Sequence, residues 1–104
     1  MIKRFRSKAL KLAFDGNTSK LIPNVAQRVV QALDALDAAI NLDDLRGLTG
    51  FHELKGDREG EYAVTITANW RLTFSPLIES QINGATGEEE ESFHVSRVDF
   101  EDYH

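Results

Sequence analysis

The chain has 104 residues, which suffices for one small domain with one hydrophobic core. It is 41% hydrophobic and 28% charged, and this composition excludes a wholly disordered chain. The lack of cysteine excludes disulfides, thiol catalysis and cysteine-ligated zinc. No apolar run approaches the ~20 residues of a membrane span or follows the basic start as a signal peptide would. We therefore expect a cytoplasmic protein with no membrane partner.

Charge is segregated along the sequence. The net charge is −5, but residues 1–74 carry 11 Lys/Arg against 9 Asp/Glu, whereas residues 75–104 carry one Arg against 8 Asp/Glu. Five of these acids, Glu79 and residues 88–91, lie in one short stretch. Because exposed charges are screened beyond about 8 Å in physiological salt, a basic patch can act locally. The acidic total therefore does not exclude a nucleic-acid partner.

The first forty residues predict a short strand and two helices. Residues 1–6 alternate weakly and predict a first strand. Ser7 is a suitable N-cap for a helix that the turn at residues 16–19 ends. Pro23 suits the first turn of a second helix. One apolar stripe follows at helical spacing: Val25, Val29, Leu33, Leu36 and Ile40. A short turn between two helices predicts an antiparallel helical hairpin.

The rest of the chain predicts strands. Residues 51–54 form a short extended piece, and residues 62–67 pair through a tight turn with residues 70–74 in a β-hairpin. Pro76 is expected to end that strand, and residues 77–92 read as a mobile acidic loop. A last strand begins at Phe93. This order predicts a single α+β domain, with two antiparallel helices packed on one face of a small antiparallel sheet.

Seven side chains could carry chemistry: His52, Lys55, Arg58, Arg71, Asp102, Tyr103 and His104. Each also has a purely structural interpretation, because isolated charges in turns are commonly solvated and chain ends fray. Arg71 is the most informative, since alternation places it on the face opposite the apolar row of Trp70 and Leu72. Three scattered histidines lack metal-ligand spacing, and no glycine-rich phosphate loop is present, so we expect no cofactor.

Three segments in order give this chain a resemblance to a known family. They are Phe51-His52-Glu53-Leu54-Lys55-Gly56-Asp57-Arg58-Glu59-Gly60, Ala68-Asn69-Trp70-Arg71-Leu72-Thr73-Phe74 and Phe100-Glu101-Asp102-Tyr103-His104. They resemble the HigB toxins, a branch of the RelE/ParE toxin superfamily, over nearly the whole chain except residues 75–92. The resemblance implies a toxin that cuts mRNA in the ribosomal A site. It also implies a helix-turn-helix antitoxin of the HigA type as partner. The toxin is then expected to contact DNA only indirectly, through its complex with that antitoxin.

The resemblance carries functional roles onto His52, Lys55, Arg71, Asp102, Tyr103 and His104. Metal-independent RNA cleavage drives the 2′-hydroxyl onto the adjacent phosphate, which needs a base, an acid and cations. The two histidines can serve as base and acid in either order, and Asp102 can orient a histidine or act as the base. Arg71 and Lys55 can hold phosphate oxygens, with Arg58 as a further substrate contact. Tyr103 can stack on a base.

Some features depart from that pattern and leave alternatives open. The acidic stretch at residues 77–92 is longer than the turn usual in the family, and Asp99-Phe100 stands where Asn-Tyr is common. His52 and Lys55 differ by an odd offset, so the strand must end or bulge between them if both reach one phosphate. The alternatives are a non-nucleolytic inhibitor of DNA gyrase, as in the ParE branch, and an inactivated toxin retained as a binding module.

Overall fold

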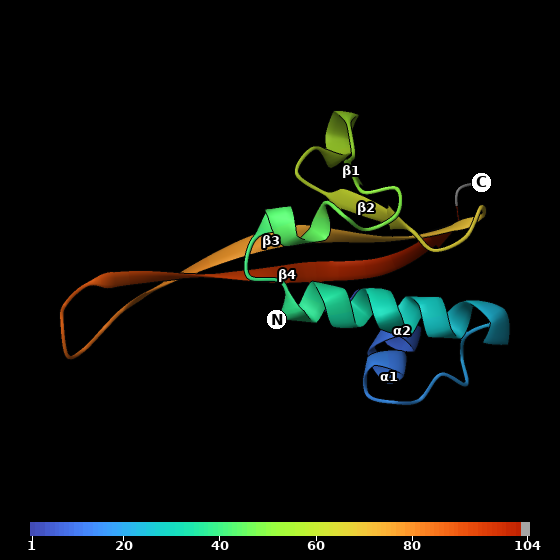
Figure 1. The fold of residues 1–104 in the computed structure, drawn as a ribbon, viewed down its shortest axis with the longest axis horizontal. Coiled ribbons are helices and arrows are strands. Elements are labelled where there is room, and N and C mark those ends of the chain that lie inside the picture. The colour runs from blue at the N-terminus through green and yellow to red at the C-terminus, as the bar shows by residue number, and fades with distance from the viewer. Residues whose placement is uncertain (103–104) are drawn as a thin grey trace.

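The computed structural model describes residues 1–102. The helices are α1 (Lys8–Phe14) and α2 (Pro23–Ala38), and two short 3₁₀ helices, η1 (Leu42–Leu45) and η2 (Gly56–Arg58), lie in the connections. The strands are β1 (His52–Glu53), β2 (Tyr62–Thr65), β3 (Trp70–Ile82) and β4 (Glu89–Asp102). They form one antiparallel sheet in the order β1-β2-β3-β4, with both helices on one side of it (Figure 1). The predicted α+β class is confirmed.

The helices begin where the sequence predicts and bury the expected stripe. The Ser7 hydroxyl accepts a hydrogen bond from the Leu10 N–H at 3.3 Å, and Pro23 occupies the first turn of α2. The buried side of α2 packs against β2, β3 and β4 through the core residues Val25, Val29, Leu33, Leu36, Val64, Leu72, Phe74, Val95 and Val98. Ile40, the expected last member of the stripe, lies beyond the end of α2 and is 77% exposed. Within the described residues, no helix is long and apolar enough to cross a membrane.

The predicted first strand is reduced to two isolated bridges. Ile2 pairs with Val95 and Phe5 with Val98, both in parallel orientation along the outer edge of β4. Residues 3–4, between the two bridges, run alongside β4 at Arg97, which has a φ of 55°. At this point the N-terminal segment and β4 do not form a regular ladder of paired residues. The prediction of a strand at residues 1–6 is therefore wrong as to length, although the segment does border the sheet.

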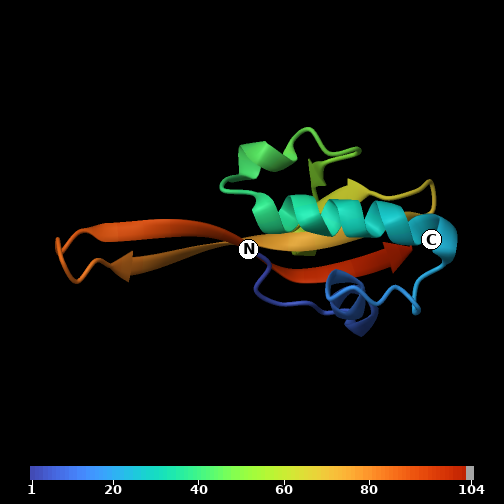
Figure 2. The ribbon, with the colours of Figure 1, turned by 60° about the horizontal axis from the view of Figure 1, so that its bottom comes forward.

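Residues 77–92 are not an irregular loop, and Pro76 does not end β3. The β3–β4 ladder continues through Pro76↔Val95 and Ile78↔Phe93 to Ile82↔Glu89, so only residues 83–88 form the turn. Pro76 is tolerated because β2 stops at Tyr62↔Phe74, which leaves β3 with one neighbour beyond that point, an edge position. This arm, residues 75–96, projects from the body as a two-stranded ribbon (Figure 2).

A β-bulge separates the arm from the body of the sheet. Thr73 pairs with Asp99 but Ser75 pairs with Ser96, so Phe74 faces two residues of β4. The extra residue shifts the alternation of β4 by one. Val98 and Phe100 therefore share the helix side of the sheet with Val95 and Phe93, despite their different parity.

Shortening the arm should leave the body intact. Replacing residues 81–90 with Asn-Gly would close the hairpin at the Ser80↔Glu91 pair with a favourable two-residue turn. Because the residues removed are almost all exposed, we expect the free energy of unfolding to change by less than about 1 kcal/mol. Chemical denaturation of both forms measures this. A loss of several kcal/mol would mean that the arm's tip helps to hold the body together.

Candidate functional site

The candidate site lies on the face of the sheet turned away from the helices. Cross-strand pairing aligns Thr65, Arg71 and Glu101 in one row. The neighbouring row joins His52, Ala63 and Thr73. Directly paired residues project from the same face of a sheet, so His52 and Arg71 share this face. Leu72, beside Arg71, is fully buried in the core, which confirms that Arg71 points away from the apolar row.

His52 is exposed at the edge strand with a defined orientation. Its Nδ1 lies 2.7 Å from the carbonyl oxygen of Gly50, which has a positive φ of 67°. A carbonyl oxygen only accepts, so the proton of the neutral ring lies on Nδ1. The lone pair on Nε2 is then available to accept a proton. His52 and Arg71 stand two strands and two residues apart, roughly 12 Å between Cα atoms, which allows both side chains to converge on one phosphodiester.

Two carboxylates hold the arginines of this face. Arg58 donates from Nη1 and Nη2 to Glu101 at 2.7 and 2.8 Å, a bidentate pair, and also hydrogen-bonds to Glu61. Arg71 Nη2 lies 3.9 Å from the same Glu101 carboxylate, and its side chain is 19% exposed. Glu101 therefore lies between the two guanidinium groups. Arg58, expected to contact substrate, fastens the end of β4 to the η2 loop through this pair.

Glu101 is the residue of this site that sequence reasoning missed. Hydrogen bonding from Arg58 lowers its pKa, with a further contribution from the Thr73 hydroxyl, while the same ion pairs raise the pKa of Arg58. The signal was present in the sequence, because Glu101 alternates with Phe100 and must share a face with Arg71 once β3 and β4 pair. What the sequence did not give is the register that makes them direct neighbours.

Lys55 lies apart from the arginine cluster. The strand does end between His52 and Lys55, as their odd offset required, because β1 stops at Glu53 and Gly56 turns the chain at a φ of 75°. Lys55 is exposed and lines a hollow of about 420 Å³ together with Glu53 and Glu59. Two acids on the same hollow make it a poor phosphate site without rearrangement.

The predicted terminal group is only partly placed. Asp102 is exposed and pairs with Trp70 at the end of β4, where the rings of Trp70 and Phe100 stack at 4.7 Å. Tyr103 and His104 lie outside the described residues. Because it pairs with Trp70, Asp102 projects to the helix side of the sheet, so β4 places it on the face opposite Arg71 and His52. Within residues 1–102, no three His, Cys, Asp or Glu side chains are grouped to hold a metal ion.

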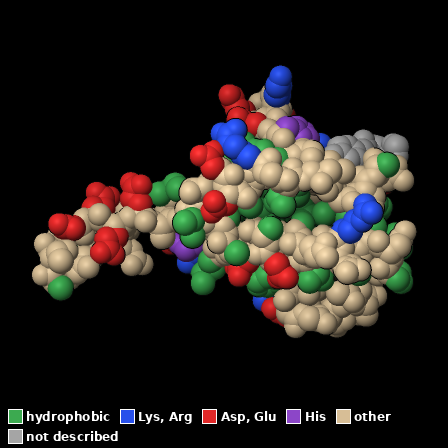
Figure 3. All heavy atoms as spheres, viewed as in Figure 1, with side chains coloured by type: hydrophobic (Ala, Val, Ile, Leu, Met, Phe, Trp, Pro, Cys, Tyr) green, Lys and Arg blue, Asp and Glu red, His purple; other side chains and the backbone are tan. Residues whose placement is uncertain are grey.

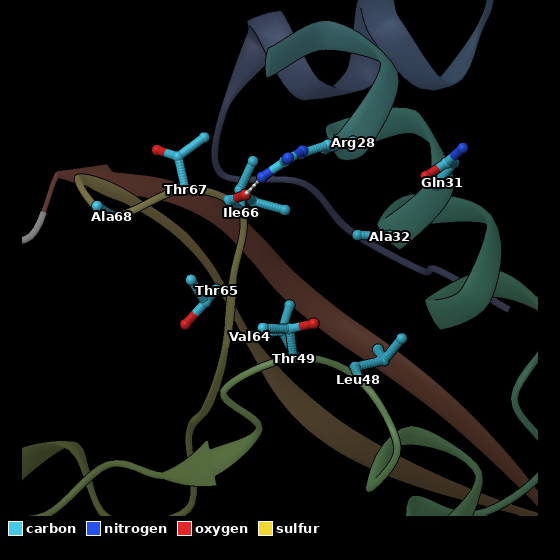
Figure 4. Close-up of a pocket in the computed structure, with 10 residues that line it drawn as sticks. All are labelled: Arg28, Gln31, Ala32, Leu48, Thr49, Val64, Thr65, Ile66, Thr67 and Ala68. Atoms are coloured by element: carbon cyan, nitrogen blue, oxygen red, sulfur yellow. Dashed lines mark hydrogen bonds between the residues drawn. The ribbon is translucent and has the colours of Figure 1, made fainter. Parts of the chain in front are cut away.

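A separate hollow of about 520 Å³ lies between α2 and the end of β2 (Figure 4). Arg28 crosses it to donate a hydrogen bond to the Ile66 carbonyl at 3.2 Å. The polar lining consists of Gln31, Thr49, Thr65 and Thr67. None of the predicted site residues lines this hollow, so it is separate from the candidate site.

The Arg58–Glu101 pair should stabilise the fold in a pH-dependent manner. At pH 7 we expect Glu101→Gln to lower the free energy of unfolding by about 1 kcal/mol, as for a partly buried bidentate pair. Because folding lowers the pKa of Glu101 below its ordinary 4.5, this contribution is complete above that pH. It should disappear as the pH falls through the lowered value.

The measurement is denaturant unfolding of both forms between pH 2.5 and 7. The exposed Lys11–Asp15 pair, at 2.8 Å with both side chains 54% exposed, gives a matched control, and Asp15→Asn should change stability by much less. An equal loss at both sites would show that burial adds nothing to the Arg58–Glu101 pair.

The chain is similar to toxins of toxin–antitoxin systems in both sequence and fold. Residues 3–84 match the family model described as the RelE-like toxin of type II toxin-antitoxin system HigB. The endoribonuclease HigB of Proteus vulgaris is 45% identical over 76 residues, which cover 71% of this chain and 83% of that protein. The solved YoeB/ParE toxin from Agrobacterium tumefaciens superposes with a TM-score of 0.55 at 16% identity, covering 97% of this chain and 99% of that one. That last likeness concerns the fold.

Proposed function

The chain belongs to the HigB family of RelE-like toxins of type II toxin–antitoxin systems, and from this premise we propose that it is an endoribonuclease that cleaves mRNA on the ribosome. The observation that carries the proposal is the placement of His52 and Arg71 on the same face of the sheet, the one turned away from the helices. RNA can reach this face at the exposed His52 and the partly exposed Arg71, although Ala63 and Thr73 in the neighbouring row are fully buried. The hollow beside α2 presents one cation, Arg28, and none of the predicted site residues.

The reaction that these side chains suit is an internal transesterification. His52 accepts the proton of the 2′-hydroxyl on Nε2, the 2′-oxygen forms a bond to phosphorus, and the bond from phosphorus to the 5′-oxygen breaks. Arg71 stabilises the charge that develops on the phosphoryl oxygens. The leaving 5′-oxygen takes a proton from His104, which the resemblance groups with Asp102 and Tyr103. The products are a 2′,3′-cyclic phosphate and a 5′-hydroxyl.

The charge of this face supports a dependence on the ribosome. Arg58 and Arg71 both lie within 4 Å of Glu101, and Lys55 shares its hollow with Glu53 and Glu59. Affinity for RNA rises with the number of phosphate groups that lysine and arginine side chains neutralise. Here each of these cations already has a carboxylate nearby, so fewer phosphates are neutralised. We infer that the ribosome, rather than this small surface, holds the message in place, so the toxin acts in the cytoplasm. Its antitoxin partner is of the helix-turn-helix HigA type, through which DNA is contacted indirectly.

The deciding experiment compares two substrates. Purified protein is incubated with mRNA bound to programmed ribosomes and with the same mRNA free in solution, and the cut ends are mapped and tested for cyclic phosphate. We expect cleavage on ribosomes to be at least 100-fold faster than on free RNA, and Arg71→Ala to slow it by about 10²–10³-fold. Equal rates on free RNA would refute ribosome dependence. Messages left intact on ribosomes, together with inhibition of purified DNA gyrase by the same protein in a parallel assay, would refute the nuclease in favour of an inhibitor of the ParE type.

A further inference from the structure

An exposed apolar surface lies where the arm leaves the body. Ile40, Tyr62, Pro76, Ile78 and Phe93 line a groove of about 490 Å³, with Glu91 on its margin. Ile40 is 77% exposed and Ile78 is 55% exposed, although both sit beside the core. Large exposed apolar side chains grouped in this way mark an interaction surface. Figure 3 shows hydrophobic side chains gathered at the base of the arm.

Register places apolar and acidic side chains side by side along this face of the arm. Ile78 pairs with Phe93, Ser80 with Glu91 and Ile82 with Glu89, and Ile82 is 76% exposed. All of these project to the helix side, because they continue the alternation of Phe74. The arm groove, as we call it here, therefore comprises the lining above together with Ile82, Glu89 and Glu91.

The charge around the arm groove is entirely negative. Residues 75–96 contain five glutamates and no lysine or arginine, and acidic side chains follow the projecting arm in Figure 3. Lys3 pairs with Glu79, which projects from the opposite face of the arm. Phosphate groups would be repelled here, so the groove is unsuited to RNA. A symmetric contact between two copies would bring the two sets of glutamates together, which disfavours that arrangement as well.

We propose that the arm groove is the docking surface for a basic amphipathic helix of the antitoxin; this rests on the proposed function, which supplies the partner. The apolar stripe of such a helix would cover Ile40, Ile78 and Phe93, and its flanking Lys or Arg side chains would meet Glu89 and Glu91. Ile78 and Ile82 are four strand residues apart, roughly 13 Å, which about nine residues of α-helix span. Charge complementarity selects this occupant.

The test uses paired substitutions on the two faces of the arm. Ile78→Asp and Glu91→Lys alter the arm groove, while Leu77→Asp and Glu90→Lys make the same chemical changes on the opposite face, where Leu77 pairs with His94 and Glu90 with Gln81. Titration calorimetry of each form with the purified antitoxin measures Kd. We expect Ile78→Asp to weaken binding at least 30-fold and Glu91→Lys about 10-fold, with both control variants within 2-fold.

Three results would overturn the inference. One is unchanged affinity for Ile78→Asp and Glu91→Lys, and another is equal weakening by the variants of both faces. The third is a dimer of the chain alone that Ile78→Asp dissociates in sedimentation, since the groove would then bind a second copy. Cleavage on ribosomes is measured separately for all four variants and should match the unsubstituted chain. A failure of the nuclease proposal would appear in that assay and not in the binding one.

Discussion

Arg71→Ala should lower the rate of RNA cleavage on ribosomes by about 10²–10³-fold, the effect of removing one preorganised electrostatic group from a transition state. Arg71 is the cation nearest the centre of the candidate face, and its side chain is 19% exposed, so its charge is only partly screened. Its planar guanidinium can bind two phosphoryl oxygens at once. Arg71→Lys keeps the charge but loses that geometry and should recover only part of the rate.

The fold should survive the loss of Arg71. Glu101 remains bidentate to Arg58, so no buried carboxylate is left without a partner. The contrasting variant is Trp70→Ala, which removes the ring stacked on Phe100 and should cost about 3 kcal/mol of unfolding free energy. Denaturant unfolding and cleavage are measured on both. If Arg71→Ala unfolds as readily as Trp70→Ala, its loss of activity reports instability, and Arg71 is structural.

The position of Glu101 adds a second consequence. Its carboxylate lies 3.9 Å from Arg71 and pairs with Arg58, so it holds both guanidinium groups in place before substrate binds. A phosphate approaching Arg71 must share that arginine with an acid. The affinity of this face for phosphate is thereby reduced, while the two arginines keep a fixed geometry. This combination suits the proposed enzyme, whose substrate the ribosome positions.

Sequence periodicity predicted the helices and the central hairpin because each buries one side. The stripe of α2 and the alternation of residues 62–74 both follow from that asymmetry. The outer part of the arm was missed because it has no buried side: Ile78 and Ile82 are separated by three polar residues, and both are largely exposed. A two-stranded ribbon exposed on both faces lacks the pattern by which a strand is recognised. Pro76 then pointed to a strand end, although an edge position tolerates it.

The candidate residues of the site could be named from the sequence, but the contacts between them across strands could not. Arg71 could be placed by alternation within its own strand, and the structure confirms it. The placement of Glu101 and its ion pair with Arg58 depend on a contact across 43 positions of the sequence, which no local pattern encodes. The bulge at Arg97 is a similar case, since it is defined by the pairing of two strands. The roles of Asp102, Tyr103 and His104 remain predictions.

His52→Gln should lower cleavage on ribosomes by about 10²–10⁴-fold, the range for loss of a general acid or base. Glutamine is close in size and can still donate to the Gly50 carbonyl, so the loop should keep its shape, but it cannot take a proton. The adjacent Glu53→Gln is the matched control, because Glu53 faces the other side of β1, where its carboxylate accepts a hydrogen bond from Gly60 N–H. That variant should cleave at nearly the normal rate.

A modified message separates a base from an acid at this position. If sulfur replaces the 5′-oxygen at the cut bond, the leaving thiolate needs no proton, so an enzyme lacking its acid regains its rate whereas one lacking its base does not. The hydrogen bond to the Gly50 carbonyl engages Nδ1 and leaves Nε2 as the nitrogen that exchanges a proton, and we propose that His52 is the base. His52→Gln should therefore stay slow on the sulfur-containing message, while removal of His104 should be rescued by it. Rescue of His52→Gln would reverse the two assignments and make His52 the acid.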